Sequence, residues 1–368
     1  MAGLLKVNKL LVKYHDRLVG TLMMSPKDDV AIFQYDKQWL ATGFSISPLE
    51  LPLKTDMFIA KHTPFYGNFG VFEDSLPDGY GRYLLNRMLR KQGVNDFDLS
   101  PLQRLSIVGK SGMGALTYEP VTDLKENVLS LSLDELQQKA LDVLSEKTDD
   151  GVDALYFNSG NSGGCRPKCL LKDEEGEWLV KFRHIYDPKD IGKREYNTML
   201  CAQKCGIEIP DCKLIDGKYF ASRRFDIASD SMRLHVATAA ALLSVSITPP
   251  MADYKQILAL TGYLTQSALA VEQMFRRMVF NVMIENKDDH AKNFSFIADE
   301  DGTWRLAPAY DLLPFPEGYH GQHATSVLGK GNPTEEDMLL VGEGIRINRK
   351  RGKAIINEIA ETIKEYNS

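Results

Sequence analysis

Two carboxylates, a histidine, a lysine and an asparagine occur within the six residues from Asp288 to Asn293. Such a polar group is costly to bury, so it belongs either to a solvated loop or to a site that uses it. Asp288 and Asn293 are five positions apart, which is the spacing of the base aspartate and the metal-binding asparagine in a phosphoryl-transfer loop. The spacing favours phosphoryl transfer, and a plain solvated loop is the alternative.

A predicted β-hairpin follows this loop and leads to another carboxylate, in the pair Tyr310-Asp311. A kinase places its Mg²⁺-binding aspartate at this point of the chain. Upstream, apolar residues recur at i, i+3, i+4 and i+7, which predicts a helix that ends just before the loop. The predicted helix is 271–285, and the hairpin consists of strands 293–298 and 304–307 with the turn Asp299–Gly302.

Phosphate groups also need a loop that can approach them closely, and the stretch from Ser159 to Lys168 is rich in glycine. It contains no GK[ST] sequence, so it is not a Walker A loop. Gly163 and Gly164 permit close approach of the backbone to a ligand, and Lys168 adds a positive charge. A Gly/Ser/Asn run is also typical of a simple turn, which is the alternative here.

Lys181 lies in Trp-Leu-Val-Lys-Phe, an apolar stretch that predicts a buried strand. A lysine in such a strand needs an anionic partner or a route by which its amine reaches solvent. Glu195, 14 residues later at the start of a predicted helix, is the candidate partner. An outward-facing lysine and a surface glutamate are the alternative.

The remaining pattern places a sheet-rich part before a helix-rich part, which predicts an α+β, bilobal, protein-kinase-like fold with an added N-terminal β-rich subdomain. The predicted segments are 1–55 for that subdomain, 56–235 for the rest of the N-lobe and 236–368 for the helical C-lobe. Further predicted elements are helices 79–92, 133–145 and 195–204, a hairpin of 169–172 and 178–182, and strands 213–215 and 219–225.

Composition excludes several classes of protein. The 368 residues carry a net charge of −6, which argues against a chain that grips nucleic acid by itself. The basic stretch 346–353 could touch a DNA backbone, although a solvated helix start is the favoured interpretation. The N-terminal 20 residues lack the apolar run of a signal peptide, and the weakly polar run 236–247 is too short to span a bilayer, so a cytoplasmic protein is expected.

The five cysteines are an odd number without export signals, so a disulfide framework is not expected. Their clustering raises the question of a zinc site, but no CxxC pattern or nearby histidine supports one. Cys201 and Cys205 are four apart on a predicted helix, which is the spacing of one buried face. Buried thiols are therefore predicted.

Several blocks of this sequence resemble the signature motifs of the HipA family, the toxin kinases of bacterial toxin–antitoxin modules. The resemblance spans nearly the whole chain. The blocks are Gly160-Asn-Ser-Gly-Gly-Cys-Arg-Pro-Lys168, Arg224-Phe-Asp226, Asp288-Asp-His-Ala-Lys-Asn-Phe-Ser295, Leu306-Ala-Pro-Ala-Tyr-Asp311, Val19-Gly-Thr-Leu22, Leu76-Pro-Asp-Gly79 and the stretch 105–115.

The resemblance implies a role for each matching residue. Asp288 would be the catalytic base, Asn293 and Asp311 would bind Mg²⁺, and Lys181 would hold the ATP phosphates with Glu195 as its partner. The other implied ATP-binding residues are Gly163, Gly164, Cys165, Arg166, Pro167 and Lys168 over the phosphates, Arg223, Arg224 and Phe225 at the adenine hinge, and His290, Ala291, Lys292 and Tyr310 around the catalytic loop.

One position departs from the family pattern. Family members often carry a serine at the place of Asn161, where autophosphorylation expels the loop and silences the kinase. An asparagine cannot accept phosphate, so Ser162 is the predicted substitute and Ser159 the next candidate.

The resemblance also implies partners. They are a HipB-like helix-turn-helix antitoxin and a protein substrate such as an aminoacyl-tRNA synthetase, with DNA contacted only indirectly through the antitoxin complex and no membrane. Two other functions stay open: a pseudokinase that binds the antitoxin without transferring phosphate, and a hydrolase that uses Asp288, Asp289 and His290 as metal ligands. The latter leaves Lys181 and Glu195 unexplained.

Overall fold

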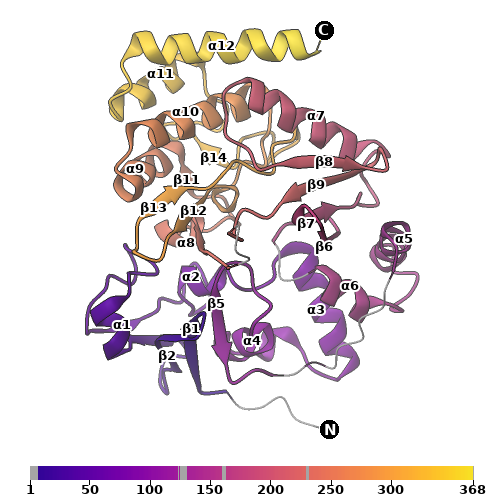
Figure 1. The fold of residues 1–368 in the computed structure, drawn as a ribbon, viewed down its shortest axis with the longest axis vertical. Helices are drawn as coiled ribbons and strands as arrows, with labels where there is room; N and C mark the ends of the chain where they lie inside the picture. The colour runs from indigo at the N-terminus through magenta and orange to yellow at the C-terminus, as the bar shows by residue number, and fades with distance from the viewer. Residues whose placement is uncertain (1–6, 123, 125–130, 160–162, 229–231, 368) are drawn as a thin grey trace. The chain divides into compact units, whose positions relative to one another are not determined.

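The structure is a computed structural model, and it describes residues 7–122, 124, 131–159, 163–228 and 232–367. The chain forms two compact units (Figure 1). The first unit comprises residues 1–193 and 213–236, and the second comprises 194–212 and 237–368. The predicted segments differ from this division, because residues 194–212 belong to the second unit and the first sheet takes in strands beyond residue 55.

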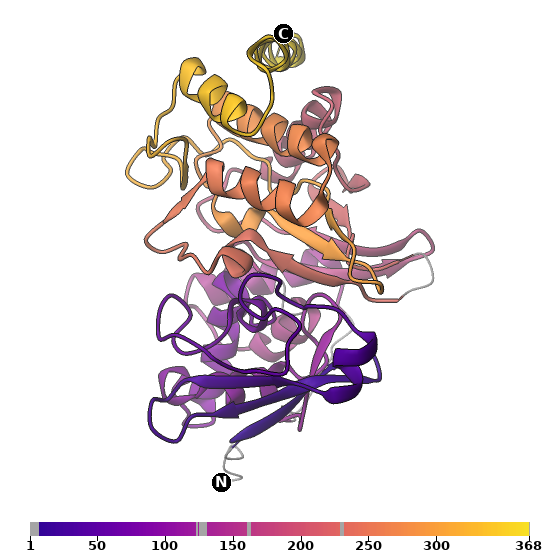
Figure 2. The same cartoon turned by 90° about the vertical axis from the view of Figure 1, so that its left-hand side faces the viewer.

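The first unit begins with an antiparallel sheet in the order β4-β3-β2-β1-β5. Figure 2 shows β1 and β2 side by side near the N-terminus, as their register requires. The strands are β1 (Lys9–Tyr14), β2 (Arg17–Met24), β3 (Ala31–Tyr35), β4 (Met57–Ile59) and β5 (Leu116–Glu119). The helices of this unit are α1 (Lys37–Thr42), α2 (Gly70–Glu73), α3 (Gly79–Lys91), α4 (Pro101–Val108), α5 (Leu133–Leu144) and α6 (Val152–Ser159), with a 3₁₀ turn η1 at Asp96–Asp98.

The first unit also contains a four-stranded sheet in the order β6-β7-β9-β8. One face of this sheet, including Trp178 and Val180, packs into a core with α3, α5 and α6. Burying each large apolar side chain there contributes roughly 1.5–3 kcal/mol. The strands are β6 (Lys168–Asp173), β7 (Gly176–Lys181), β8 (Cys212–Ile215) and β9 (Tyr219–Arg223).

The second unit is mostly helical. α9 and α10 lie side by side (Figure 2), and α12 packs against α10 and α11 (Figure 1). The helices are α7 (Ile191–Lys204, from residue 194 on), α8 (Ala239–Leu243), α9 (Tyr254–Thr265), α10 (Ala268–Met283), α11 (Glu335–Gly344) and α12 (Arg349–Asn367), with a 3₁₀ turn η2 at Ala291–Asn293. The remaining strands form the sheet β10-β12-β13 and the pair β11-β14. Their bounds are β10 (His235–Thr238, in this unit from residue 237 on), β11 (Ala252–Asp253), β12 (Ser295–Ala298), β13 (Trp304–Leu306) and β14 (Thr325–Ser326).

Most predicted elements are confirmed, and the errors are shifts of a few residues at their ends. α5 begins at a capping box in which Ser132 and Glu135 bond each other's backbone amides. α7 begins at Ile191, four residues before the predicted start. Residues 291–293 form a 3₁₀ turn, so the strand predicted from 293 begins at Ser295.

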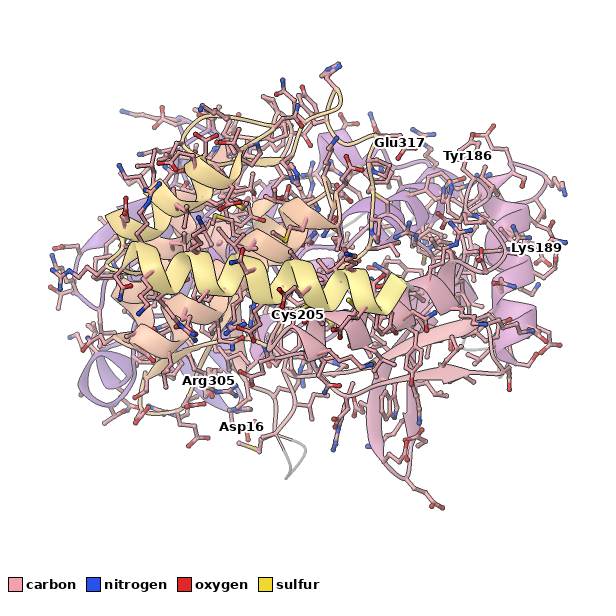
Figure 3. The ribbon with its side chains drawn as sticks, turned by 90° about the horizontal axis from the view of Figure 1, so that it is seen from above. Asp16, Tyr186, Lys189, Cys205, Arg305 and Glu317 are labelled. Atoms are coloured by element: carbon pink, nitrogen blue, oxygen red, sulfur yellow. The ribbon has the colours of Figure 1, made fainter. Side chains whose placement is uncertain are left out.

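The prediction for the cysteines holds for three of them. Cys169, Cys201 and Cys205 are buried, whereas Cys212 is half-buried and Cys165 is exposed. Figure 3 shows Cys205 beside α12. Among the described residues no group of His, Cys, Asp or Glu side chains could hold a metal ion.

Within the basic stretch 346–353, residues 349–353 form the start of α12, as the favoured interpretation predicted, and residues 346–348 precede the helix. Arg349 pairs with Glu336 and Glu343, and Arg351 pairs with Glu272 at 2.5 Å. These arginines are therefore used within the unit. In the part of the chain that the structure describes, no helix is long and apolar enough to cross a membrane.

Candidate active site

The predicted site residues are divided between the two units, and each half is described by itself. The first unit holds Lys168, Lys181 and the hinge segment 223–225, whereas the second holds Glu195, the loop 288–293 and Asp311. The pairing of Lys181 with Glu195 joins one residue of each unit and stays a prediction. Asn161 and Ser162 lie outside the described residues, so self-phosphorylation at Ser162 also stays a prediction.

The glycine-rich loop is anchored by the turn Leu76-Pro-Asp-Gly79. The Asp78 carboxylate accepts a hydrogen bond from the Gly164 amide at 2.5 Å, and the Gly164 carbonyl accepts one from the Tyr80 amide at 3.0 Å. Gly79 has φ +44°, and a Cβ on it would lie 2.5 Å from the Gly164 carbonyl oxygen. Only glycine fits there, because both the backbone conformation and the available space exclude a side chain.

Two lysines face each other beneath this loop. Lys168 on β6 is directly opposite Lys181 on β7, so both side chains leave the same face of the sheet. Lys168 is only 5% exposed, and its amine donates to the Gly163 carbonyl; the Lys181 amine lies 5.9 Å from the centre of the Phe220 ring. Like charges directly opposite are destabilising, so this pair favours an anion such as a phosphate between or beside them.

We expect Asp78→Ala to weaken ATP binding by about tenfold, because a hydrogen bond to a charged acceptor contributes roughly 1.5–3 kcal/mol. Loss of this bond frees the Gly164 amide and loosens the loop without touching Lys181. Calorimetric titration of the variant with Mg·ATP measures the effect.

The matched control is Asp98→Ala, which removes an exposed carboxylate from the same unit. Asp78→Asn keeps an acceptor oxygen and should recover part of the affinity. Equal ATP affinity in wild type and Asp78→Ala would show that the anchor does not position the loop.

Two arginines of the predicted nucleotide site are held by carboxylates. Arg166 forms a bidentate pair with Asp187 at 2.9 and 3.2 Å. Burial raises the pKa of Asp187, but the bonds from Arg166 and the His184 amide outweigh it, so this pKa is lowered overall. The pair fixes the end of the loop to the segment that follows β7.

Arg224 is held in the same way in the hinge segment. Its guanidinium bonds the buried Asp226 at 3.0 and 2.7 Å, and Asp226 also accepts the Gly114 amide at 2.9 Å. Burial raises the pKa of Asp226, but the hydrogen bond and charge of Arg224 outweigh this effect, so the pKa is lowered overall. The Arg224 amide donates to the Glu177 carbonyl at 2.9 Å, so this amide is not the donor for adenine. Arg223 is exposed and Phe225 half-buried.

In the second unit, the loop after α10 presents one exposed carboxylate on a buried frame. Asp288 is exposed, whereas Asp289 and Ala291 are buried. The Asn293 side-chain amide donates to the Asp288 carbonyl at 2.9 Å and closes the loop over its five-residue spacing. The buried Nδ1 of His290 has no hydrogen-bond partner among the described residues.

Asp289 is the structural carboxylate of the pair. It is 0% exposed and accepts hydrogen bonds from the Tyr254 hydroxyl at 2.8 Å and the Thr325 amide at 3.2 Å, while His323 Nδ1 lies 3.0 Å away. Burial and the Asp289 charge raise the pKa of Tyr254, which keeps it a donor. Sequence reasoning missed Tyr254, Thr325 and His323, because they lie more than 30 residues from Asp289 in the chain.

We expect His323→Ala to lower the free energy of unfolding by about 1–3 kcal/mol, because it deprives a buried carboxylate of a partner. Urea denaturation followed by circular dichroism measures this. The control is His320→Ala, an exposed histidine on the same segment. Equal losses in the two variants would contradict the role given to His323.

Asp311 is positioned by its neighbours on both sides. The Tyr310 hydroxyl donates to the Lys292 carbonyl at 2.7 Å and lies 2.6 Å from the Ser295 hydroxyl. The Asn286 side chain donates to the Asp311 carbonyl at 3.3 Å. These bonds tie Asp311 to the loop 288–293. Asp311 has φ +58°, a conformation that aspartate adopts more readily than most residues.

A buried arginine supports the strand that leads to Asp311. Arg277 of α10 is 2% exposed and donates to the Ala307 carbonyl at 2.7 Å. Burial lowers its pKa to about 10, partly offset by the charges of Glu208 and Tyr310. The helix pattern predicted only an apolar face here, so Arg277 was also missed.

The residues present fit Mg²⁺ bound together with nucleotide phosphates. Asp311 offers carboxylate oxygens, and Asn293 offers its side-chain carbonyl oxygen because its amide group is already bonded. Mg²⁺ prefers oxygen ligands and is usually held by one or two carboxylates plus substrate phosphates.

Comparisons with known proteins agree with this arrangement. The sequence model of the HipA-like C-terminal domain matches residues 160–366, and that of the HipA N-terminal domain matches residues 10–119. The structure of HipA in the HipA, HipB and operator DNA complex of Shewanella oneidensis matches with a TM-score of 0.72 and 18% identity, over 97% of this chain and 89% of that one.

Two curated relatives extend the comparison. A putative kinase, Y4dM, of Sinorhizobium fredii is 26% identical over 85% of this chain and 79% of its own length. The serine/threonine-protein kinase toxin HipA of Shewanella oneidensis is 22% identical over 81% and 73%. The structural match confirms the predicted α+β, kinase-like fold. The chain belongs to the HipA-like family, because the family model of the C-terminal domain matches more than half of it.

Proposed function

We propose that this chain is an ATP- and Mg²⁺-dependent serine/threonine protein kinase that acts as the toxin of a toxin–antitoxin module. The observation that carries the proposal is the loop of the second unit, where Asp288 is exposed on a frame fixed by Asn293 and Asp289. An exposed carboxylate held in place beside metal-binding oxygens is the arrangement that orients an acceptor hydroxyl.

In this proposal Asp288 accepts the proton of the acceptor hydroxyl. The hydroxyl oxygen forms a bond to the γ-phosphorus of ATP, the bond from that phosphorus to the bridging oxygen breaks, and ADP leaves with the electron pair. Bound Mg²⁺ neutralises phosphate charge. Asn293 and Asp311 would hold it through oxygens that the surrounding hydrogen bonds already orient.

The family resemblance assigns nucleotide-binding roles to residues in each unit. Lys181 and Lys168 are assigned to its phosphates, covered by Gly163 to Pro167, and the segment 223–225 to adenine. His290, Ala291, Lys292 and Tyr310 would line the nucleotide on the side of the catalytic loop. Support comes from the two lysines on one sheet face and from the unpartnered Nδ1 of His290.

The hydrolase alternative is disfavoured by Asp289. Its carboxylate is fully buried and already accepts hydrogen bonds from Tyr254 and Thr325, so it is not presented to a metal beside Asp288. A pseudokinase would keep the fold but would lack at least one of the catalytic or Mg²⁺-binding residues. Every implied catalytic and Mg²⁺-binding residue is present in the sequence, which disfavours that alternative as well.

The toxin role and its partners rest on the relatives. The Shewanella structure contains HipA with HipB and operator DNA, so we propose a HipB-like helix-turn-helix antitoxin for this chain and DNA contact through that complex. The protein substrate we propose is a translation component such as an aminoacyl-tRNA synthetase, in the cytoplasm.

The test is transfer of ³²P from γ-labelled ATP to proteins of a bacterial extract, followed by phosphoamino-acid analysis. Phosphoserine or phosphothreonine on an extract protein is the expected result. Release of labelled inorganic phosphate alone would indicate a hydrolase, and ATP binding without either product would indicate a pseudokinase.

A further inference from the structure

A cavity of about 200 Å³ lies within the first unit at the end of β7. Its wall is built from a strand end, a loop, a turn and two helices. The lining residues are Gln137 of α5, Lys181 of β7, Arg183 and Lys189 of the following loop, Ile191 and Gly192 of α7, and Lys218 of the β8–β9 turn. A water occupies roughly 30 Å³ in the liquid, so the cavity has room for a tetrahedral oxyanion and some waters.

The charge of this cavity is strongly positive. Lys181, Arg183, Lys189 and Lys218 line it, and no carboxylate is among the lining residues that the structure describes. Lys218 already has a partner outside the wall, because its amine lies 2.5 Å from Asp134. Arg183 and Lys189 add two further positive charges to the wall, which favours a multiply charged anion.

Arg183 is the lining residue that most strongly indicates an anion. Its side chain is half-buried, and it forms no hydrogen bond or ion pair with any described residue. A partly buried guanidinium without a partner is costly, and its planar fork of donors matches the oxygens of a phosphate. Lys189 is likewise without a partner in the described ranges. Figure 3 shows Lys189 and the neighbouring Tyr186 on the outer side of this unit.

The first turn of α7 adds to the positive potential. α7 has 14 residues and begins at Ile191, in the cavity wall, so its N-terminal dipole end lies there. Gly192 makes this placement feasible, because a Cβ at that position would lie 2.1 Å from the Lys218 carbonyl oxygen. The close approach of the helix end to the β8–β9 turn therefore depends on glycine, and it fixes the helix end in the wall.

We propose that this cavity is a binding site for a phosphate-class oxyanion, with Arg183 and Lys189 as ligands in addition to the proposed kinase residues. Two sources can supply an oxyanion of this chemistry. It is either the terminal phosphate of a nucleotide held at Lys181 or a free phosphate beside that nucleotide. Only the first source rests on the proposed function, since the second needs no phosphate transfer.

The experiment is calorimetric titration of the full chain with inorganic phosphate. Arg183→Gln should weaken phosphate binding by about tenfold or more, because it removes charge-assisted hydrogen bonds. Arg183→Lys keeps the charge and should recover part of the affinity. The matched control is Lys193→Gln, which removes an exposed cation of α7 outside the cavity wall and should stay within about twofold of wild type.

Repeating the titration with saturating Mg²⁺ and a non-hydrolysable ATP analogue, which fills the γ-phosphate position, identifies the source. Phosphate that still binds is a free phosphate beside the nucleotide, and phosphate that is excluded shares its position with the nucleotide's own phosphates. The proposal is overturned if wild type binds no phosphate, or if Arg183→Gln, with an unchanged thermal unfolding midpoint, binds it as wild type does. Failure of ³²P transfer would refute the kinase proposal alone, because phosphate titration does not depend on catalysis.

Discussion

Asp288→Asn is expected to lower phosphate transfer by about 10²–10⁴-fold, the usual contribution of a positioned general base. The change keeps the size of the side chain and removes its ability to accept the proton. Asp288 is exposed, and the bond from Asn293 goes to its main-chain carbonyl, which the substitution keeps. ATP affinity and stability should therefore stay near those of wild type.

Transfer of ³²P under single-turnover conditions measures this loss directly, with ATP affinity determined on the same preparation. Glu300→Gln is the matched control, because it neutralises an exposed carboxylate in the hairpin turn that follows the same loop. Transfer within about twofold of wild type in Asp288→Asn would remove Asp288 as the base. Asp289 would be a poor replacement candidate, since it is fully buried and hydrogen-bonded.

Much of the local structure could be predicted from the sequence, because it depends on patterns within one segment. α10 shows its apolar face at helical spacing, and the hairpin of β6 and β7 follows from apolar runs on either side of a turn rich in Asp, Glu and Gly. The start of α7 was missed, because Gly192 reads as a poor helix former. Its packing against the Lys218 carbonyl is a tertiary reason that no local pattern contains.

The residues that hold the site in place were predicted less well, for the same physical reason. The spacing of Asp288 and Asn293 predicts the proposed catalytic loop, since both lie in one short segment. The side chains that support the proposed site come from far along the chain: Asp78 bonds Gly164, and His323 lies beside Asp289. A buried polar partner is chosen by three-dimensional proximity, and single-sequence spacing carries no information on it.

Asp311→Ala is the second change for which we expect a large effect. A carboxylate that helps to hold Mg²⁺ contributes several kcal/mol of charge stabilisation in the transition state, so transfer should fall by roughly 10²-fold or more. The Tyr310 hydroxyl donates to the Lys292 carbonyl, and the Asn286 side chain donates to the Asp311 main-chain carbonyl. The substitution keeps both bonds, so the backbone position should survive it.

The measurement is transfer as a function of Mg²⁺ concentration, combined with growth of cells that express the chain without an antitoxin. Wild type should arrest growth, and Asp311→Ala should relieve the arrest while the protein accumulates to the same level. Asp301→Ala, which removes an exposed carboxylate from the nearby hairpin turn, should arrest growth as wild type does. Equal arrest by wild type and Asp311→Ala, with transfer lost in the variant, would separate toxicity from kinase chemistry. Unchanged transfer and an unchanged Mg²⁺ requirement would instead remove Asp311 from the metal site, because a lost carboxylate ligand must weaken the binding of the ion it holds.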